Sequence, residues 1–386
     1  MGCQKMFCEI DSLTQKYVKI LEDVCNIESP TNFKEGVDRV GNYFAELAKS
    51  LGFYTEKFKQ EVAGDVLCIT MNKDANGKPI ALSGHMDTVH KIGLFGYPPV
   101  RIEGNKIYGP GVADCKGGIV AGFMAMEALK NIGFKDRPIM MLLESDEEVS
   151  SNISNKATIN YICEKAKDCV AFLNLESYSS QQPRKAIISR KGILRFEIKV
   201  TGIEAHSSKC ATDGANAIVE AAHKIIEIDK IKDNDGITCN CGVINGGSVA
   251  NTVAGECTIV VDVRVVTKEQ GEWIKKRLKE ITDTVYIEGC NSTLKLISYR
   301  VPMELCDKNI ALLNRVNEIF EENGLCRLEK GSGLGGSDAA DVTAYGIPCL
   351  DSLGVYGNHI HSVKEESYLD SLSDSAKRLA AVIKCF

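Results

Sequence analysis

The chain has 386 residues, more than the ~250–300 at which a single hydrophobic core usually stops growing, so we expect two domains. Hydrophobic residues make up 44% of the sequence and charged residues 25%, which is typical of a globular protein. The formal net charge of −6, without a basic block or arm, argues against nucleic-acid binding. No apolar run approaches the ~20 residues of a membrane span, so we expect no membrane association.

The cysteine content indicates a reducing environment. Sixteen cysteines are scattered from Cys3 to Cys385 without a CxxC pair, and Cys68 and Cys349 lie inside apolar, strand-like runs. Free cysteine behaves as a small core residue. A chain of this length does not need a disulfide framework, so we expect reduced thiols and a cytoplasmic location.

The first part of the chain alternates helical and strand patterns. Apolar residues recur every three or four positions in some segments, as in amphipathic helices. In others they form short unbroken runs, as in strands covered on both faces. This alternation predicts an α/β domain with a mainly parallel sheet. In chain order the expected elements are helix 11–27, helix 34–51, strand 65–71, strand 79–84, helix 113–131, strand 138–145, helix 156–167 and strand 169–176.

The pattern changes after residue 188. A β-α-β-β-α-β succession follows within ~110 residues, which is the ferredoxin-like α+β order. We therefore expect an inserted domain at 189–300, while 1–188 and 301–386 form the large domain. The expected elements are strand 191–201, helix 214–228, strands 236–245 and 252–266, helix 268–281, strand 292–299, then helix 307–323, strand 347–353 and a final helix.

Acidic residues and histidines follow the ends of the buried strands, where open α/β sheets bind their ligands. Each alone is more often a surface or capping residue, and only their joint placement indicates a site. Histidine nitrogen and carboxylate oxygen are the ligands of catalytic zinc. A two-metal site also needs a carboxylate that both ions share. The candidates are His85, Asp87, Asp114, Glu147, Glu148, Glu176, His359 and His361.

Nine motifs in order carry a family resemblance across nearly the whole chain. They are SGHMDTVH, YGPGVADCKGG, ESDEEVSSN, LNLES, GIEAHSS, GGSVANTV, VDVR, GGSDAAD and GNHIHSVKEE. Together they resemble the dinuclear zinc metallopeptidase family of aminoacylase, acetylornithine deacetylase, succinyl-diaminopimelate desuccinylase and glutamate carboxypeptidase. The resemblance is closest to the glutamate carboxypeptidase branch because of KIYGPGVADCKGG, Glu176 in place of Asp, and the HSVKEE ending.

The resemblance implies two divalent metal ions, zinc first, with cobalt or manganese as alternatives. In it Asp114 bridges the two ions. His85 and Glu176 complete one metal site, and Glu148 and His361 complete the other. It also implies a cis peptide bond after Asp114.

Two further residues receive roles from the same resemblance. Glu147 is the general base and acid of the reaction. Asp87 accepts a hydrogen bond from His85 and fixes its tautomer. Residues two apart at a strand end face opposite ways, so His359 is expected to point away from Asp114.

His206, in GIEAHSS, is the implied oxyanion donor, delivered by the partner subunit of a homodimer that the inserted domain forms. Because the donor must reach the large domain, hinges are expected near Ile188 and Val301, with substrate favouring a closed state.

The loop GSGLGGSDAAD is expected to hold a substrate carboxylate. Gly335 and Ser337 would do so through N–H groups at a helix N-terminus. Asn251 and Arg300 are further candidates, whereas Arg264 either binds substrate or pairs with an acidic neighbour. The loop also matches GxGxxG, but a dinucleotide fingerprint would open a βαβ unit with an acidic residue ~20 positions later.

The expected function is hydrolysis of an amide bond adjacent to a free carboxylate, by a carboxypeptidase or peptidase acting on a small peptide. An N-acyl amino acid deacylase and a non-catalytic metal-binding homologue remain alternatives, although the presence of Glu147 and Asp87 disfavours the second. The sequence departs from the family twice. Ser150 replaces the usual glycine, which puts the geometry of Glu148 in question, and Cys115 places an oxidisable thiol beside the metals.

Overall fold

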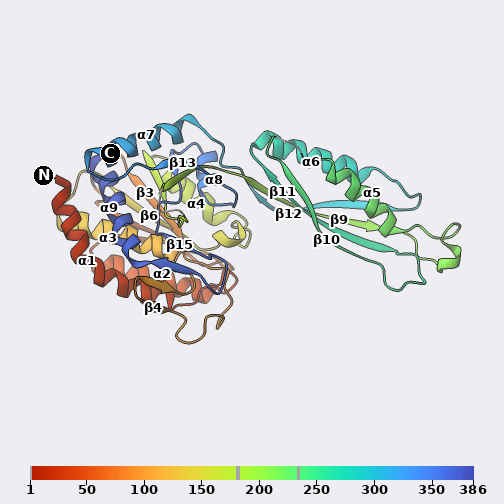
Figure 1. Cartoon of the computed structure of the whole chain (residues 1–386), viewed down its shortest axis with the longest axis horizontal. Coiled ribbons are helices and arrows are strands. Elements are labelled where there is room, and N and C mark those ends of the chain that lie inside the picture. Colours follow the sequence, from red (N-terminus) through yellow and green to blue (C-terminus); the bar gives the residue numbers. More distant parts are fainter. Residues whose placement is uncertain (1, 180–182, 233–234) are drawn as a thin grey trace. The chain divides into compact units, whose positions relative to one another are not determined.

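The computed structural model describes residues 2–179, 183–232 and 235–386 (Figure 1). The chain divides into two compact units. The larger comprises Met1–Ile188, Leu305–Ser332 and Ser337–Phe386, and the smaller comprises Ser189–Glu304 and Gly333–Gly336. The expected inserted domain at 189–300 falls within the smaller unit, which extends a few residues further.

A six-stranded sheet forms the centre of the larger unit, in the order β1-β2-β6-β3-β7-β14. The last four strands in this order run parallel, and β1 and β2 add an antiparallel edge. The prediction of a mainly parallel α/β sheet is therefore confirmed. The strands are β1 (Tyr54–Phe58), β2 (Val66–Met71), β3 (Ile80–His85), β6 (Ile139–Glu144), β7 (Ala171–Asn174) and β14 (Cys349–Leu350).

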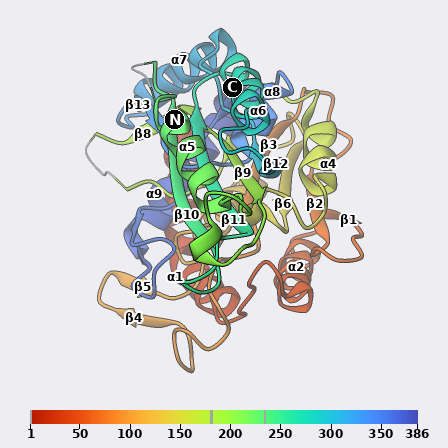
Figure 2. The same cartoon turned by 90° about the vertical axis from the view of Figure 1, so that its right-hand side faces the viewer.

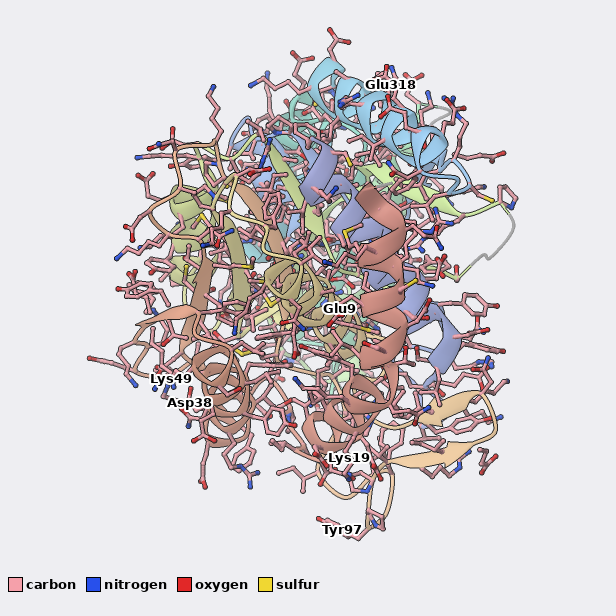
Figure 3. All side chains as sticks on the ribbon, turned by 90° about the vertical axis from the view of Figure 1, so that its left-hand side faces the viewer. Glu9, Lys19, Asp38, Lys49, Tyr97 and Glu318 are labelled. Atoms are coloured by element: carbon pink, nitrogen blue, oxygen red, sulfur yellow. The ribbon has the colours of Figure 1, made fainter. Side chains whose placement is uncertain are left out.

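Helices cover this sheet and make its buried strands possible. α3 is buried along almost its whole length and packs against α1 and α9. The outer face of α1 carries charged side chains such as Glu9 and Lys19 (Figure 3). The helices are α1 (Gly2–Cys25), α2 (Lys34–Ser50), α3 (Lys116–Asn131), α4 (Ala157–Ala166), α7 (Asp307–Glu322), α8 (Ala339–Ala344) and α9 (Leu369–Cys385).

Several short strands were not predicted, most of them because two or three residues are too few to show an apolar run. Four of them form a small sheet, β15-β16-β5-β4, and two more pair as β13-β8. They are β4 (Arg101–Glu103), β5 (Lys106–Tyr108), β8 (Lys185–Arg190), β13 (Glu329–Gly333), β15 (Gly357–Asn358) and β16 (Glu366–Tyr368).

The smaller unit has the predicted ferredoxin-like β-α-β-β-α-β order, and all its neighbouring strands are antiparallel, in the order β10-β11-β9-β12. β9 and β11 alternate buried and exposed residues, and α5 and α6 cover one face of the sheet (Figure 2). The elements are β9 (Gly192–Thr201), α5 (Ala217–Asp229), β10 (Thr238–Gly246), β11 (Glu256–Val265), α6 (Lys268–Asp283) and β12 (Asn291–Arg300).

All sixteen cysteines are free thiols, and ten of them are buried. They therefore act as small core residues in both units. Among the helices of the described segments, none is long and apolar enough to cross a membrane.

Candidate metal centre

The expected ligands come from the carboxyl edge of the parallel strands and from two turns. His85 is the last residue of β3, and Glu176 follows β7. Glu148 lies in a 3₁₀ turn, Glu147–Val149, that follows β6. Asp114 precedes α3, and His361 lies between β15 and β16. Parallel strands end at the same edge of a sheet, which is why residues so far apart in sequence meet here.

Asp114 stands at the centre of this group. Its Oδ1 lies 3.1 Å from Nε2 of His85, and its Oδ2 lies 3.0 Å from Nε2 of His361. His85 Nε2 also lies 3.6 Å from Oε1 of Glu176, and His361 Nε2 lies 3.2 Å from Oε2 of Glu148. The five side chains thus form two sets of three that share Asp114, one oxygen facing each set.

His361, rather than His359, makes the contact with Asp114. Both residues have positive φ, 57° for His359 and 61° for His361, so the turn departs from an extended strand. His359 is exposed, and no ion pair joins it to the other described residues.

The spacing of these atoms suits a tetrahedral cation. Two ligand atoms bound at ~2.0–2.1 Å to one zinc ion lie about 3.3 Å apart. The four contacts around Asp114 span 3.0–3.6 Å, and they join imidazole nitrogens to carboxylate oxygens. Both donor types are those of catalytic zinc, so the residues fit two divalent cations with a shared carboxylate.

Asp87 supports the centre from beneath and is fully buried. Its Oδ1 lies 3.3 Å from Nδ1 of His85, whose ring also contacts the Asp87 carbonyl at 3.0 Å. The same carboxylate accepts hydrogen bonds from Thr31 Oγ1 and from the N–H groups of Glu147 and Glu148. Asp87 therefore orients His85 and holds the turn that carries both glutamates.

The electrostatics of the group show how strongly it attracts positive charge. Burial and the Asp114 charge raise the pKa of Glu148 to about 8 and that of Glu176 well above its ordinary value. Burial also opposes ionisation of Asp114, but hydrogen bonds from His361 and His85 outweigh it and keep its pKa well below the usual range. Hydrogen bonds to Asp114 and Glu148 raise the pKa of His361 to about 11. Protons thus balance charges that cations would otherwise neutralise.

Glu147 is buried and precedes Glu148 in the same 3₁₀ turn. After burial and Asp114, its charge is a further cause of the raised pKa of both Glu148 and Glu176. The Glu147 charge therefore acts on a carboxylate of each set, which agrees with the general-base role expected for it.

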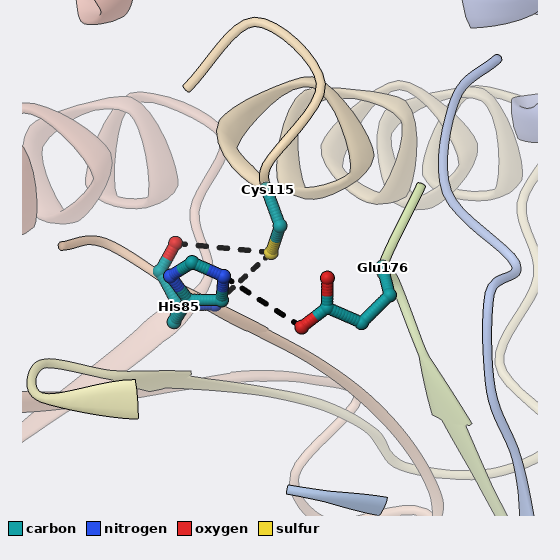
Figure 4. Close-up of side chains that lie close together, drawn as sticks. All are labelled: His85, Cys115 and Glu176. Carbon is teal, nitrogen blue, oxygen red and sulfur yellow. Dashed lines mark hydrogen bonds and ion pairs between the residues drawn. The ribbon is translucent and has the colours of Figure 1, made fainter. Parts of the chain in front are cut away.

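Cys115 packs against His85 in the interior, and a ring nitrogen of His85, Sγ of Cys115 and a carboxylate oxygen of Glu176 all lie within 4.8 Å of one another (Figure 4). Its Sγ accepts a hydrogen bond from the His85 N–H at 3.2 Å and lies 3.8 Å from the His85 carbonyl oxygen. Burial raises the pKa of this thiol to about 12, so it is protonated at neutral pH. The expected cis bond between Asp114 and Cys115 is confirmed.

Ser150 keeps the backbone shape that glycine would provide. It has φ 59° and ψ 40°, in the left-handed region, and the next residue, Ser151, has φ 53°. The turn after Glu148 is therefore formed without glycine, at a modest conformational cost.

Glu365 and His90 belong to the surroundings of Asp114 but were not among the expected site residues. The Glu365 carboxylate accepts hydrogen bonds from the N–H groups of Ala113 and Asp114, and it contacts His90. In the sequence, KEE is typical of an exposed turn, and nothing in it indicates burial.

The expected substrate residue Ser337 is also buried, and its hydroxyl oxygen accepts hydrogen bonds from the Asn174 side-chain amide and from the N–H of Ala339.

The remaining expected residues belong to the smaller unit. His206 and Asn251 are brought together there, because the Ser207 N–H donates to the Asn251 carbonyl and His206 pairs with Thr252. Both side chains are exposed. Arg300 is 1% exposed and Gly335 is exposed. Arg264 pairs with Asp262, with Nε 2.8 Å from Oδ1, so of its two expected roles the structure shows the pairing with an acidic neighbour.

The chain is similar to known proteins over most of its length. A family model for a peptidase dimerisation domain matches residues 188–290, and one for peptidase family M28 matches residues 66–232. Carboxypeptidase G2 of Pseudomonas sp. (strain RS-16) is 31% identical over 358 residues, covering 92% of this chain and 84% of that protein. Acetylornithine deacetylase of Vibrio parahaemolyticus is 30% identical over 253 residues, covering 60% and 62%. The solved structure of aminopeptidase PepT from Bacillus cereus has the same fold, with TM-score 0.79, 20% identity and coverage of 96% and 98%.

Proposed function

This chain belongs to the M20 peptidase family and is a metal-dependent amide hydrolase, and we propose that it cleaves small peptides beside a free carboxylate. We propose further that His85, Asp114, Glu148, Glu176 and His361 hold two zinc ions. The observation that carries this proposal is Asp114, whose two oxygens face two separate sets of ligand atoms. Cobalt and manganese bind the same donor types, so metal analysis of the purified protein decides the identity.

The residues around the centre account for the chemistry. When bound, two such cations provide a Lewis acid for the scissile carbonyl and lower the pKa of the attacking water. Glu147 accepts the proton of that water and then passes it to the leaving nitrogen. Asp87 keeps the proton of the His85 ring on Nδ1, so that Nε2 faces the cation. Hydrolysis thus needs no group beyond those at this edge and a donor for the oxyanion.

We propose His206 as that donor. The Ser208 N–H donates to Nδ1 of His206 at 3.3 Å, which leaves the proton of the neutral ring on Nε2. The ring is exposed and therefore able to meet a substrate oxygen. His206→Ala is expected to lower kcat by ~10²–10³ with unchanged zinc content. An unaltered kcat would remove His206 from the mechanism.

We also propose a homodimer formed by the smaller unit, 189–300. The dimerisation-domain model matches this region. Strand β10 lies at the edge of its sheet, and Val243 and Ile244 on it and Ile226 on α5 are 49–57% exposed. An exposed apolar strand edge favours pairing with another chain. Sedimentation should show a dimer that Val243→Asp together with Ile226→Lys dissociates, and a wild-type monomer would contradict it.

Reduced thiols support a reducing compartment, so we propose the cytoplasm as the location. Localisation of a tagged chain would test this separately from activity.

The substrate class is tested with matched pairs. Dipeptides, N-acetyl amino acids and γ-glutamyl substrates are assayed with chelator-treated and with zinc-reloaded protein. Each substrate with a free carboxylate is compared with the same compound in C-terminally amidated form. We expect zinc-dependent hydrolysis of a peptide with a free carboxylate and a loss of at least ~10²-fold in kcat/KM on amidation, since buried polar groups would be left unpaired. Equal rates on both forms would contradict carboxylate recognition. A preference for N-acetyl amino acids would favour the deacylase alternative, which the similarity to acetylornithine deacetylase supports.

A further inference from the structure

Glu365 is a fully buried carboxylate directly behind the metal centre. It lies four residues after His361, just before β16. Its Oε1 accepts hydrogen bonds from the N–H groups of Ala113 and Asp114, both at 3.0 Å. Its Oε2 lies 2.6 Å from Nε2 of His90. The buried charge thus has three partners, as such a charge requires.

The hydrogen bonds of Glu365 fix the main chain of Asp114 and therefore the direction of its side chain. The two N–H groups that it accepts belong to consecutive peptides, one of them that of Asp114 itself. Holding them fixes the backbone from which the Asp114 carboxylate projects. The segment 361–365 therefore contacts Asp114 twice. His361 contacts its side-chain Oδ2, and Glu365 accepts a hydrogen bond from its main-chain N–H.

His90 orients Glu365. It is 5% exposed, lies five residues after His85, and packs edge-on against Phe95 with ring centroids 4.9 Å apart. Nε2 of His90 lies at hydrogen-bond distance from Oε2 of Glu365, and this contact fixes the direction of the carboxylate. His90 therefore ties the loop after β3, which includes Asp87, to the turn that contains His361 and Glu365.

We propose that Glu365, oriented by His90, is the positioning residue that sets Asp114 between the two cations. Its own oxygens are taken by the three donors, so it acts through Asp114 and not as a ligand. This inference rests on the two-cation centre proposed above. Partners of this kind typically change metal affinity by 10–100-fold when they are removed.

The test measures zinc affinity, not only activity. Zinc dissociation constants are determined by competition with a chromophoric chelator for wild type, Glu365→Ala, Glu365→Gln and His90→Ala. We expect Glu365→Ala to weaken at least one zinc by ~10–100-fold and His90→Ala to weaken it less. Glu365→Gln should stay within about threefold, because its amide oxygen still accepts both N–H groups and its NH₂ group can donate to the other His90 tautomer.

Glu366→Ala is the matched control. Glu366 is the next residue and is 7% exposed, and its Oε2 pairs with Nζ of Lys106 at 3.0 Å instead of contacting the Asp114 backbone. It should change the melting temperature of the metal-free protein but not zinc affinity.

The outcomes separate the two proposals. If the wild-type protein binds no zinc, both the proposed two-cation centre and this inference are wrong. Normal wild-type binding with unchanged affinity in Glu365→Ala would overturn the inference alone. If Glu365→Ala fails to fold, an unchanged zinc affinity in His90→Ala, or a large loss in Glu365→Gln, overturns it as well.

Discussion

The two units bury charged groups in opposite ways. In the smaller unit the Lys224 ammonium is fully buried, yet it donates to the carbonyls of Ile281, Thr282 and Thr284 and pairs with Glu220 at 2.9 Å. At the carboxyl edge of the larger sheet, three carboxylates contact two imidazoles, and burial with the Asp114 charge raises the pKa of Glu148 to about 8. In the first region, groups of the protein itself compensate the buried charge. In the second, only bound protons compensate the negative charge of the carboxylates. Incomplete compensation of this kind distinguishes a site prepared for cations from a structural ion pair.

The largest expected effect compares two neighbouring glutamates within the second region. Glu147→Gln should keep two zinc ions and lose kcat by ~10²–10⁴, because only its proton transfer is removed. Glu148→Gln should lose zinc from one site, because its carboxylate lies 3.2 Å from His361 in a ligand set. Zinc content by mass spectrometry with single-turnover rates checks both. Zinc loss in Glu147→Gln equal to that in Glu148→Gln would sink the assignment.

Removing the buried Lys224 charge from the smaller unit should lower the free energy of unfolding without changing zinc affinity. Lys224→Met leaves three carbonyls without their donor and leaves the buried Glu220 carboxylate with only the N–H groups of Tyr286 and Ile287, so we expect a loss of ~3–5 kcal/mol in unfolding free energy with unchanged zinc affinity. The control is Lys230→Met at the end of the same helix, where the pair with Glu227 is exposed and worth ~0–1 kcal/mol. Equal losses in the two variants, measured by urea unfolding, would contradict the contrast.

The pH dependence should differ between metal-free and zinc-loaded protein. The folded state holds a proton on Glu148 up to a pKa of about 8, whereas the unfolded chain releases it near the ordinary value of 4.5. His361, at about 11 against 6.5, acts in the same direction at higher pH. Bound protons that unfolding releases make stability fall as pH rises.

Melting temperatures at pH 5.5, 7 and 8.5 test this expectation. The metal-free protein should lose several degrees across the series, while zinc, which displaces these protons, should bind more tightly with rising pH. A metal-free protein that gains stability from pH 5.5 to 8.5 would show that protons do not balance the site.

The smallest effect concerns the turn after Glu148. Ser150→Gly removes a left-handed non-glycine residue and should raise the unfolding free energy by up to about 1 kcal/mol with kcat unchanged. A fall in kcat would show that Ser150 has a role beyond the backbone conformation of the turn.

Much of the site could be predicted because its residues lie at strand ends, which apolar runs mark in the sequence. His85 and Glu176 follow such runs directly. Glu365 could not be predicted, since its burial depends on strands β15 and β16, which are only two and three residues long. Strand β1 (YTEKF) was missed because a half-buried edge strand needs no apolar run. Helix α1 starts nine residues before the expected 11–27, since Met6 and Ile10 continue its buried face.

The order of the ligands along the chain has a consequence for synthesis. His85, Asp114 and Glu176 all precede the smaller unit, whereas His361 follows it, in the segment that also supplies β14 beside β7. A growing chain therefore carries one complete set of three ligand residues before the smaller unit is made. The second set lacks His361 until the last part of the chain leaves the ribosome. In the proposed two-cation centre, a cation can therefore bind the second set only after the ribosome has translated His361.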